Sequence, residues 1–381
     1  MEAGDKRTIV ISGVNLTNGG PLSIFKDCLA YAALHLSSRY RIVALVHGKE
    51  LFDSPGLTFI EFPQAKKSWL IRLYYEFVHF RKLSRQLAPF LWFSLHDISP
   101  AVYAARRAVY CHNPSPFYRL KVREALLEPR FALFNLLYRY LYRINIKAND
   151  FVVVQQEWLR QAFQRLYGIA NVIVAHPDVP PITAQGPSRR PPRFSFMFPA
   201  LPRVFKNFEV IAEAAMLLQE SGAANVEIRL TINGDETRYS RYIYRKYGRI
   251  PSLKFIGVQP RERIFELYRE TDCLLFPSKL ETWGLPLTEF KIFDKPILAA
   301  DLPYARETIG RYDKVKFFDP DNPGELARHM GQLIAGRLVY DKTEDPMPAQ
   351  PFAGNWHELF EILLAPGAQG TPEQRSSRRT M

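Results

Sequence analysis

The stretch that decides the fold reads CLLFP at residues 273–277 and, after three further residues, ETWGLPLTE at 281–289. The first part is a short apolar run typical of a buried strand, and the second opens a helix with Pro286 in its first turn. Glu281 is therefore expected on the loop at the carboxyl end of a strand, and Glu289 in the first turn of the next helix. In open α/β sheets, ligands bind at this edge.

The residue types in this block suit a sugar and an anion. Gly284 lets the backbone approach a ligand closely, and the N–H groups at a helix start favour anionic oxygens. Each carboxylate accepts two hydrogen bonds at once, which suits the vicinal diol of a ribose or a hexose. The alternative is a surface loop with two unrelated glutamates. The spacing alone does not decide between a ligand site and such a loop.

A second motif begins eighty residues earlier. Residues 194–200 (FSFMFPA) predict a strand, and LPRVFKN at 201–207 leads into a helical pattern that begins at Phe208. Arg203 and Lys206 would then lie between the first strand of a half-domain and its first helix. Two cations there would bind a diphosphate, Arg through its bidentate fork and Lys as a compact charge. A solvated basic turn is the alternative, and the apolar neighbours of both charges argue against it.

Together the two motifs resemble the signature of retaining, nucleotide-sugar-dependent glycosyltransferases of the GT-B fold, family four, also called glycosyl transferases group 1. The resemblance spans residues 8–364 and departs at Thr282 and Trp283, where Gly or Ser and Phe are commoner. It implies an α/β protein of two doubly wound, Rossmann-like domains facing a central cleft. It also implies transfer from a nucleoside diphosphate sugar with retention at the anomeric carbon. No cofactor is implied, and no metal either, since cationic side chains and helix starts would stabilise the leaving diphosphate.

The resemblance assigns roles to individual residues. Glu281 would hold hydroxyls of the transferred sugar, Glu289 the ribose, and Arg203 and Lys206 the charge of the departing diphosphate. The predicted catalytic residues are His112, Arg203, Lys206 and Glu281. The predicted donor-binding residues are Gly19, Gly20, Asn233, Gly234, Ile256, Val258, Trp283, Gly284, Leu285 and Glu289.

The amino-terminal half has the pattern of a doubly wound domain. A buried strand at 8–14 precedes Gly19 and Gly20, and a helix is expected from about Leu22. A plain turn is the alternative for this glycine pair. Two histidines, His96 and His112, follow predicted strand ends. A histidine at a strand end is more often structural than catalytic, but the resemblance places the second near the transferred sugar and ranks His96 behind it.

We expect five segments along the chain. They are an acceptor-side domain at 1–183, a Pro-rich linker at 184–192, a donor domain at 193–349, a helical region at 350–365 that returns towards the first domain, and a disordered tail at 366–381.

Composition agrees with a globular protein of two domains. The 381 residues can bury a sizeable core, and no apolar run reaches the roughly 18 residues that a membrane span needs. The start, MEAGDKRTIVISG, leads into a strand and does not resemble a signal peptide. Cys28, Cys111 and Cys273 lie far apart in apolar contexts, so we expect buried, reduced thiols in the cytoplasm.

Charge is distributed unevenly. Residues 1–190 carry 25 Lys and Arg against 13 Asp and Glu, a net of +12, whereas residues 191–381 carry a net of +1. The excess is interleaved with aromatics at 65–90 and 117–147, which predicts helices that lie on an anionic membrane surface. Ordinary solvated helix faces are the alternative, and nucleic acid is disfavoured because no binding motif accompanies the charge. The residues assigned to the acceptor or membrane side are His96, Lys66, Lys67, Arg81, Lys82 and Arg85.

The predicted function is transfer of a hexosyl residue, with GDP-mannose or a UDP-hexose as the favoured donor. The acceptor would be a lipid-linked glycan in bacterial surface polysaccharide or lipopolysaccharide biosynthesis, with the enzyme peripheral on the inner face of the membrane. Two alternatives stay open. One is a nucleotide-sugar epimerase of the same architecture, which needs no acceptor. The other is a non-catalytic, membrane-associated scaffold of a glycan assembly complex.

Overall fold

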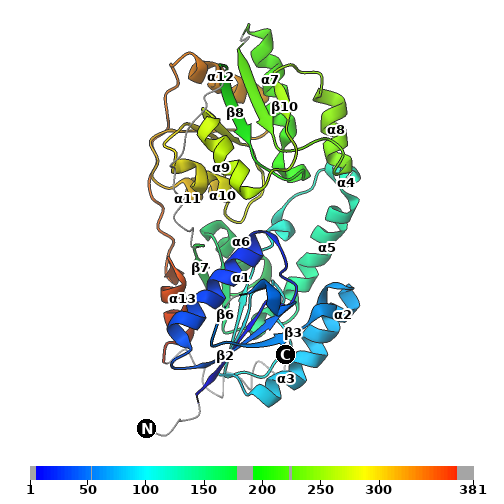
Figure 1. Ribbon diagram of the computed structural model, residues 1–381, viewed down its shortest axis with the longest axis vertical. Helices are drawn as coiled ribbons and strands as arrows, with labels where there is room; N and C mark the ends of the chain where they lie inside the picture. Colours follow the sequence, from blue (N-terminus) through cyan, green and yellow to red (C-terminus); the bar gives the residue numbers. More distant parts are fainter. Residues whose placement is uncertain (1–5, 53, 178–191, 223–224, 367–381) are drawn as a thin grey trace. The chain divides into compact units, whose positions relative to one another are not determined.

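The computed structural model describes residues 6–52, 54–177, 192–222 and 225–366. The chain forms two compact units, each built on one parallel sheet (Figure 1). The first unit comprises the described parts of Met1–Asn113, Tyr138–Asp178 and Pro348–Met381, and the second those of Pro114–Leu137 and Val179–Met347.

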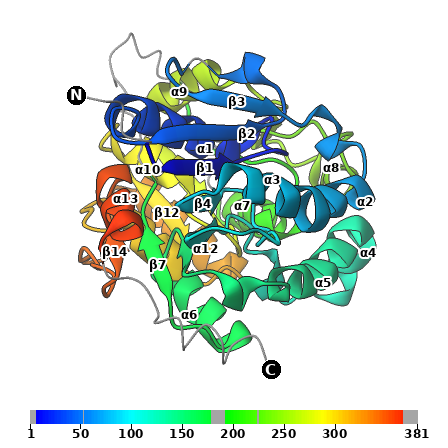
Figure 2. The same cartoon turned by 90° about the horizontal axis from the view of Figure 1, so that it is seen from below.

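The first unit contains an eight-stranded sheet in the order β14-β7-β6-β5-β4-β1-β2-β3, with every pairing parallel. Figure 2 shows β3, β2, β1 and β4 side by side in this order. Most of these strands are continuous apolar runs because both faces of the sheet are covered. The strands are β1 (Thr8–Ser12), β2 (Arg41–Val46), β3 (Thr58–Glu61), β4 (Leu91–Ser94), β5 (Arg106–Tyr110), β6 (Phe151–Val154), β7 (Val172–Ala175) and β14 (Phe352–Ala353).

Two apolar clusters cover the faces of this sheet. Ile9 and Ile11 point into a cluster that includes side chains of α1 and α13, whereas Val10 packs on the other face with Phe80 and Trp92. The helical segments of this unit are α1 (Gly19–Tyr31), η1 (Ala32–Leu36), η2 (Lys49–Leu51), η3 (Pro63–Lys66), α2 (Trp69–Tyr74), η4 (Tyr75–His79), α3 (Phe80–Leu87), η6 (Ile146–Ala148), α6 (Glu157–Tyr167) and α13 (Trp356–Leu364).

The second unit has a six-stranded parallel sheet in the order β10-β9-β8-β11-β12-β13. Its strands are β8 (Phe194–Phe198), β9 (Val226–Leu230), β10 (Leu253–Phe255), β11 (Cys273–Phe276), β12 (Ile297–Ala300) and β13 (Val315–Phe318). Its helices are η5 (Ser115–Phe117), α4 (Val122–Leu127), η7 (Val204–Lys206), α7 (Phe208–Glu220), α8 (Arg238–Tyr247), α9 (Arg261–Glu270), α10 (Leu285–Lys291), α11 (Pro303–Ile309) and α12 (Pro323–Ile334). The division between the units falls inside α5 (Pro129–Arg143).

Both sheets reverse their strand order at an equivalent place. The reversal lies between β1 and β4 in the first unit and between β8 and β11 in the second. The loops after these four strands therefore leave the carboxyl edge of each sheet at a topological switch point, where open α/β sheets bind ligands. The prediction of two doubly wound α/β domains is confirmed.

The structure differs from the sequence prediction in two places. Helix α1 begins at Gly19 and not near Leu22, so the glycine pair lies within its first turn and not ahead of it. The segment Pro114–Leu137, predicted within the first domain, groups with the second unit, because Phe131 packs on Phe205 at a ring distance of 5.3 Å.

The carboxyl-terminal helix α13 belongs to the first unit, where Phe360 stacks on Tyr31 with ring centroids 5.6 Å apart. The predicted linker at 184–192, apart from its last residue, lies outside the described residues. So does the predicted tail after Pro366.

Candidate functional site

Two loops at the switch point of the second unit are held against each other. One joins β8 to α7 and contains Phe205 and Asn207; the other joins β11 to α10. The backbone N–H of Lys279 donates to the carbonyl of Phe205 at 2.7 Å, and the Asn207 side chain donates to the carbonyls of Pro277 and Pro320 at 3.3 and 2.7 Å. Asn207 has a left-handed backbone (φ 59°), which asparagine tolerates better than most residues. Hydrogen bonds to backbone carbonyls, two of them from the Asn207 side chain, therefore hold the two loops in place.

This arrangement brings Lys206 and Glu281 together. The Lys206 ammonium donates a hydrogen bond to Oε1 of Glu281 and forms an ion pair with it. The two side chains are 17% and 13% exposed, so the pair is largely withdrawn from water yet still reachable. Residues 75 positions apart in the sequence thus form one charged centre at the switch point.

Arg203 lies on the same loop as Lys206. Its Nε lies 3.3 Å from Oε1 of Glu128, and its guanidinium stacks over the Phe131 ring at 4.8 Å. The side chain is 41% exposed. Burial raises the pKa of Glu128, while Arg203 and the backbone N–H of Val204 oppose that shift. Glu128 therefore positions the cationic loop, a role that sequence reasoning missed because nothing in the local pattern marks it.

Lys279 adds a third cation that sequence reasoning also missed. Its ammonium lies 2.7 Å from Oδ1 of Asp321, and the side chain is 16% exposed. Lys121 contacts the same carboxylate at 3.1 Å. The available signal was position, because Lys279 lies between the predicted strand at 273–277 and Glu281.

Glu289 lies in α10 and is 7% exposed. Its Oε2 accepts from the Tyr268 hydroxyl at 3.2 Å, and its Oε1 lies 3.0 Å from the Arg261 guanidinium. Burial raises the pKa of Glu289, and the opposing effects of Arg261 and Tyr268 only partly offset it. Both partners come from α9, so one helix orients the carboxylate carried by another.

The start of α10 needs a glycine. Gly284 has φ +88°, and a Cβ there would come within 3.3 Å of the Phe276 ring. Next to it, the Trp283 indole N–H donates to the Thr288 hydroxyl at 3.0 Å, and the indole is mostly buried. Trp283 therefore stabilises the first turn of α10, with Leu285 as the first helical residue.

Four of the predicted donor-binding residues, Asn233, Gly234, Ile256 and Val258, follow the ends of β9 and β10. The N–H groups of Asn233 and Gly234 both donate to the Glu236 carboxylate, at 2.5 and 3.0 Å. Burial works against ionisation of Glu236, but these N–H groups and the Ser240 hydroxyl outweigh it and lower its pKa. Two adjacent backbone donors thus already hold an anion, as a phosphate site would.

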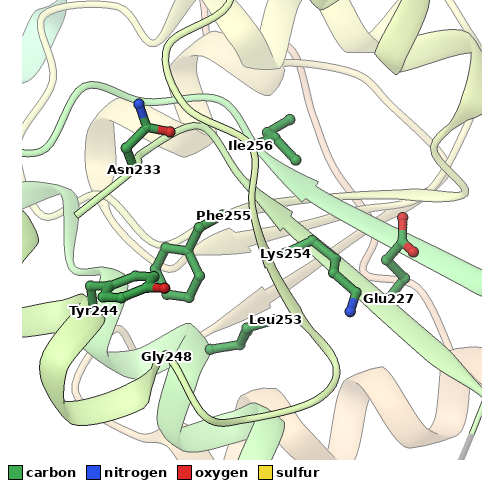
Figure 3. A pocket seen from close by; sticks show the side chains of 8 residues that line it. All are labelled: Glu227, Asn233, Tyr244, Gly248, Leu253, Lys254, Phe255 and Ile256. Atoms are coloured by element: carbon green, nitrogen blue, oxygen red, sulfur yellow. The ribbon is translucent and has the colours of Figure 1, made fainter. Parts of the chain in front are cut away.

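Asn233 and Ile256 also line an open pocket of about 520 Å³ beside the edge strand β10 (Figure 3). Two aromatic side chains, Tyr244 and Phe255, also line it, and their ring centroids are 5.0 Å apart. Val258 does not line it and is 56% exposed.

In the first unit, the loop after β1 precedes Gly19, which has φ +74°, and Gly20, which has open space around it. The Lys66 ammonium donates to the Thr17 hydroxyl in this loop, so it faces the loop and not only solvent. Arg81 and Arg85 both donate to the Tyr103 hydroxyl, at 3.0 and 2.8 Å. Lys67 and Lys82 are exposed.

His96 is fully surrounded. Its Nδ1 lies 2.9 Å from the Arg72 guanidinium and its Nε2 lies 2.9 Å from the Ser12 hydroxyl. Because arginine can only donate, Nδ1 accepts and Nε2–H donates to Ser12. Burial lowers the pKa of His96 well below its ordinary value, and nearby Arg72 lowers it further. With both nitrogens engaged, the geometry favours a structural role for His96, which ties β4 to β1 and to α2.

His112 differs because one ring nitrogen has no partner. Its Nε2 is buried and, among the described residues, makes no hydrogen bond, although the ring stacks on Tyr110 at 4.4 Å. Burial lowers the pKa of His112, and Asp97 and a hydrogen bond to the backbone of Leu95 partly oppose this. A carbonyl can only accept, so that bond uses the single N–H of the neutral ring and leaves Nε2 as an acceptor.

Asp97 fixes the position of His112. Its carboxylate accepts from the backbone N–H groups of His112 and Asn113 at 2.5 and 3.0 Å. The hydroxyls of Tyr142 and Tyr138 donate to it at 2.8 and 3.0 Å. Asp97 therefore positions the loop that carries His112, a role that sequence reasoning missed.

Cys28, Cys111 and Cys273 are free and buried. Within the part of the chain that the structure describes, no three His, Cys, Asp or Glu side chains are grouped to hold a metal ion. In the same part, no helix is long and apolar enough to cross a membrane.

Comparison with known proteins gives a family for the second unit. Residues 180–346 match the family described as Glycosyl transferases group 1. A serotype-specific mannosyltransferase of Escherichia coli, WbdA, is 26% identical over 103 residues. That match covers 27% of this chain and only 12% of the relative.

Solved structures resemble the chain over most of its length. Sucrose-phosphate synthase from Thermosynechococcus elongatus gives a TM-score of 0.62 at 13% identity, covering 87% of this chain and 90% of that one. The lipopolysaccharide outer core galactosyltransferase WaaB, in its apo form, gives 0.60 at 14% identity, covering 88% and 92%. HepE of Anabaena in complex with UDP-glucose gives 0.58 at 15% identity, covering 86% and 90%. The chain therefore has the GT-B fold, and its residues 180–346 resemble the glycosyl transferases group 1 family.

Proposed function

We propose that this protein is a retaining glycosyltransferase that moves a hexosyl residue from a nucleoside diphosphate sugar to a lipid-linked glycan acceptor. The observation that carries the proposal is the Lys206–Glu281 pair, because it places a cation and a diol-binding carboxylate together at the switch point of a family-matched unit. Glu289 lies eight residues further on, in the helix that follows the same loop.

The chemistry assigned to the second unit is electrostatic. As the bond to the sugar breaks, negative charge grows on the diphosphate, and Arg203 and Lys206 stabilise it. Because Lys206 pairs with Glu281 in the free protein, donor binding would draw the ammonium towards phosphate and release the carboxylate to accept sugar hydroxyls. Glu289 would accept from the ribose. No metal is needed in this scheme, since the cations and the N–H groups at the start of α10 carry the charge.

His112 is assigned to the transferred sugar. Its buried, unpaired Nε2 accepts a hydrogen bond from a sugar hydroxyl, which would satisfy an atom that is otherwise costly to bury. The acceptor hydroxyl attacks the face that the diphosphate leaves, which gives retention. This front-face path follows from the family resemblance.

The donor and acceptor classes rest on the relatives and on charge. The Escherichia coli relative is a mannosyltransferase, which supports GDP-mannose, and the Anabaena structure holds UDP-glucose, which supports a UDP-hexose. The net charge of +12 in residues 1–190 suits a peripheral position on an anionic inner membrane, where lipid-linked acceptors of bacterial surface polysaccharides are found.

A thermal-shift panel tests the donor site. GDP-mannose, UDP-glucose, UDP-galactose, UDP-N-acetylglucosamine and dTDP-rhamnose are compared for their effect on the melting temperature. One donor should raise the melting temperature, because its binding stabilises the folded protein by mass action. At a concentration of a hundred times its Kd, the added stability is about 2.7 kcal/mol. The same donor should raise the melting temperature of the Glu289→Ala variant far less. Equal shifts in the two proteins would exclude Glu289 from the donor site.

A further inference from the structure

Helix α5 carries a continuous apolar stripe on its outer side. Leu133, Leu136, Leu137, Tyr140 and Ile144 are each between 44% and 59% exposed. The first four, at spacings of three, four and seven residues from Leu133, lie on one face of α5, and Ile144 directly follows the last residue of the helix. Single exposed leucines are ordinary, but a contiguous row of this length marks an interaction surface. We call these five residues the leucine stripe.

The opposite face of α5 already has its partners. Tyr138 and Tyr142 are buried and donate to Asp97, and Phe131 packs on Phe205. The sequence suggested that the aromatics of this segment would lie on a membrane together with the arginines. The structure corrects this for these three aromatics, because they anchor the helix inward and leave leucines and arginines outward.

The charges around the stripe are of one sign. Arg130, Arg139 and Arg143 are exposed, and residues 115–149 contain only two carboxylates. Glu124 accepts from the backbone N–H of Lys121 and from the Tyr118 hydroxyl, and Glu128 pairs with Arg203. A ligand of this face must therefore combine apolar contact area with negative charge.

The helical segment α2–η4 in the first unit also exposes apolar residues at helical spacing, with lysines beyond its two ends. Leu70, Tyr74 and Val78, four residues apart along α2 and η4, are 79%, 51% and 44% exposed, with Lys67 and Lys82 beyond the two ends. The ring of Trp69, on α2, packs on that of Tyr138, on α5, with centroids 6.3 Å apart. The only acid between residues 62 and 96, Glu76, is buried and paired with Arg72, so it does not offset the surface charge.

We propose that the leucine stripe inserts into the boundary between headgroups and acyl chains of an anionic bilayer, while the flanking arginines bind lipid phosphates. This proposal names the residues that enter the membrane, and it rests on the proposed function for the lipid-linked acceptor. A second copy of the chain fits less well. A two-fold interface through this face would bring the exposed arginines of one copy close to those of the other, and like charges disfavour association.

The test separates insertion from charge attraction. Vesicles of phosphatidylethanolamine with phosphatidylglycerol should co-sediment the wild-type protein, and at about 0.5 M salt, where charge attraction is screened, a bound fraction should remain. The triple variant Leu133→Gln/Leu136→Gln/Leu137→Gln should lose that fraction, with a partition coefficient lower by at least about tenfold. Leu34→Gln is the matched control, since Leu34 is a 77% exposed leucine of η1 in the first unit, and it should bind as the wild type does.

A reporter locates the stripe directly. Because the three native cysteines are buried, Leu136→Cys can carry an environment-sensitive fluorophore, with Leu34→Cys as its control. Anionic vesicles should shift the emission of the first reporter to the blue and leave the second unchanged. The proposal would be overturned if salt released the wild-type protein completely or if the triple variant bound as the wild type does. A concentration-dependent dimer that the triple variant abolishes would also overturn it. The donor thermal shift should be the same in wild type and triple variant, so a failed donor site would be recognised separately.

Discussion

Lys206→Ala tests the charged centre most sharply, because its effects on stability and on rate should differ in size. The Lys206–Glu281 pair is partly exposed, at 17% and 13%, and it is a single ion pair. Lys206→Ala leaves the mostly buried Glu281 carboxylate without this partner, which costs about 1–3 kcal/mol of stability. With an unfolding entropy of about 2.1 cal/mol/K for each residue, that corresponds to a fall of the melting temperature by about 1–4 °C.

The effect on catalysis should be larger. Removing one group that stabilises developing charge typically costs about 2.7–4 kcal/mol. At 1.36 kcal/mol for each factor of ten, kcat should fall about 100- to 900-fold. Initial rates of nucleoside diphosphate release at saturating donor and acceptor give kcat, and calorimetric unfolding gives the stability change.

Two further variants complete the design. Lys206→Arg keeps the charge and should retain more activity than Lys206→Ala, although a bulky fork replaces a compact ammonium. Lys279→Ala removes a neighbouring cation that pairs with Asp321 and not with Glu281, and should cost less. An unchanged kcat with a raised KM in Lys206→Ala would reduce Lys206 to a binding residue and refute the assignment.

Four other variants test the remaining assignments. Glu289→Ala should weaken binding of the bare nucleoside diphosphate while Glu281→Ala spares it but impairs turnover, and calorimetry showing equal losses would refute this division. Burial holds the pKa of His112 below the ordinary 6.5, so the pH profile of kcat/KM should fall on the acid side with a midpoint below that value. His112→Asn should abolish this acid limb. If the variant keeps the limb, another group is responsible for it. Gly284→Ala should cost roughly 1–2 kcal/mol of stability because φ is +88° there, and an unchanged melting temperature would show that α10 can begin without a left-handed residue.

The fold could be read from the sequence because both sheets are parallel. Parallel strands are apolar throughout, so β11 at Cys273–Phe276 ends one residue before its predicted bound and β8 at Phe194–Phe198 ends two residues before its own. Helix starts were less predictable. Gly19 with its left-handed backbone begins α1, although glycine reads locally as a turn residue.

The site was predictable where residues are near in sequence to a strand end. Lys206 and Glu281 each follow an apolar run, and sheet order then brings them together. Glu128 and Arg261 act on Arg203 and Glu289 from other helices, and no sequence period connects such partners. For the same reason the sequence could not tell which side of α5 faces inward, since Asp97, which binds Tyr142, lies 45 residues away.

Acceptor-dependent transfer is the most direct test of the central claim. The donor identified by thermal shift is incubated with the protein and with membrane lipid extract as the acceptor source, and the product is isolated. Proton and carbon NMR then give its anomeric configuration. The account predicts nucleoside diphosphate release that depends on acceptor, with the donor's own anomeric configuration kept in the product. Conversion of the nucleotide sugar without any acceptor would indicate an epimerase, an inverted linkage would contradict retention, and absence of turnover with every donor would favour a scaffold.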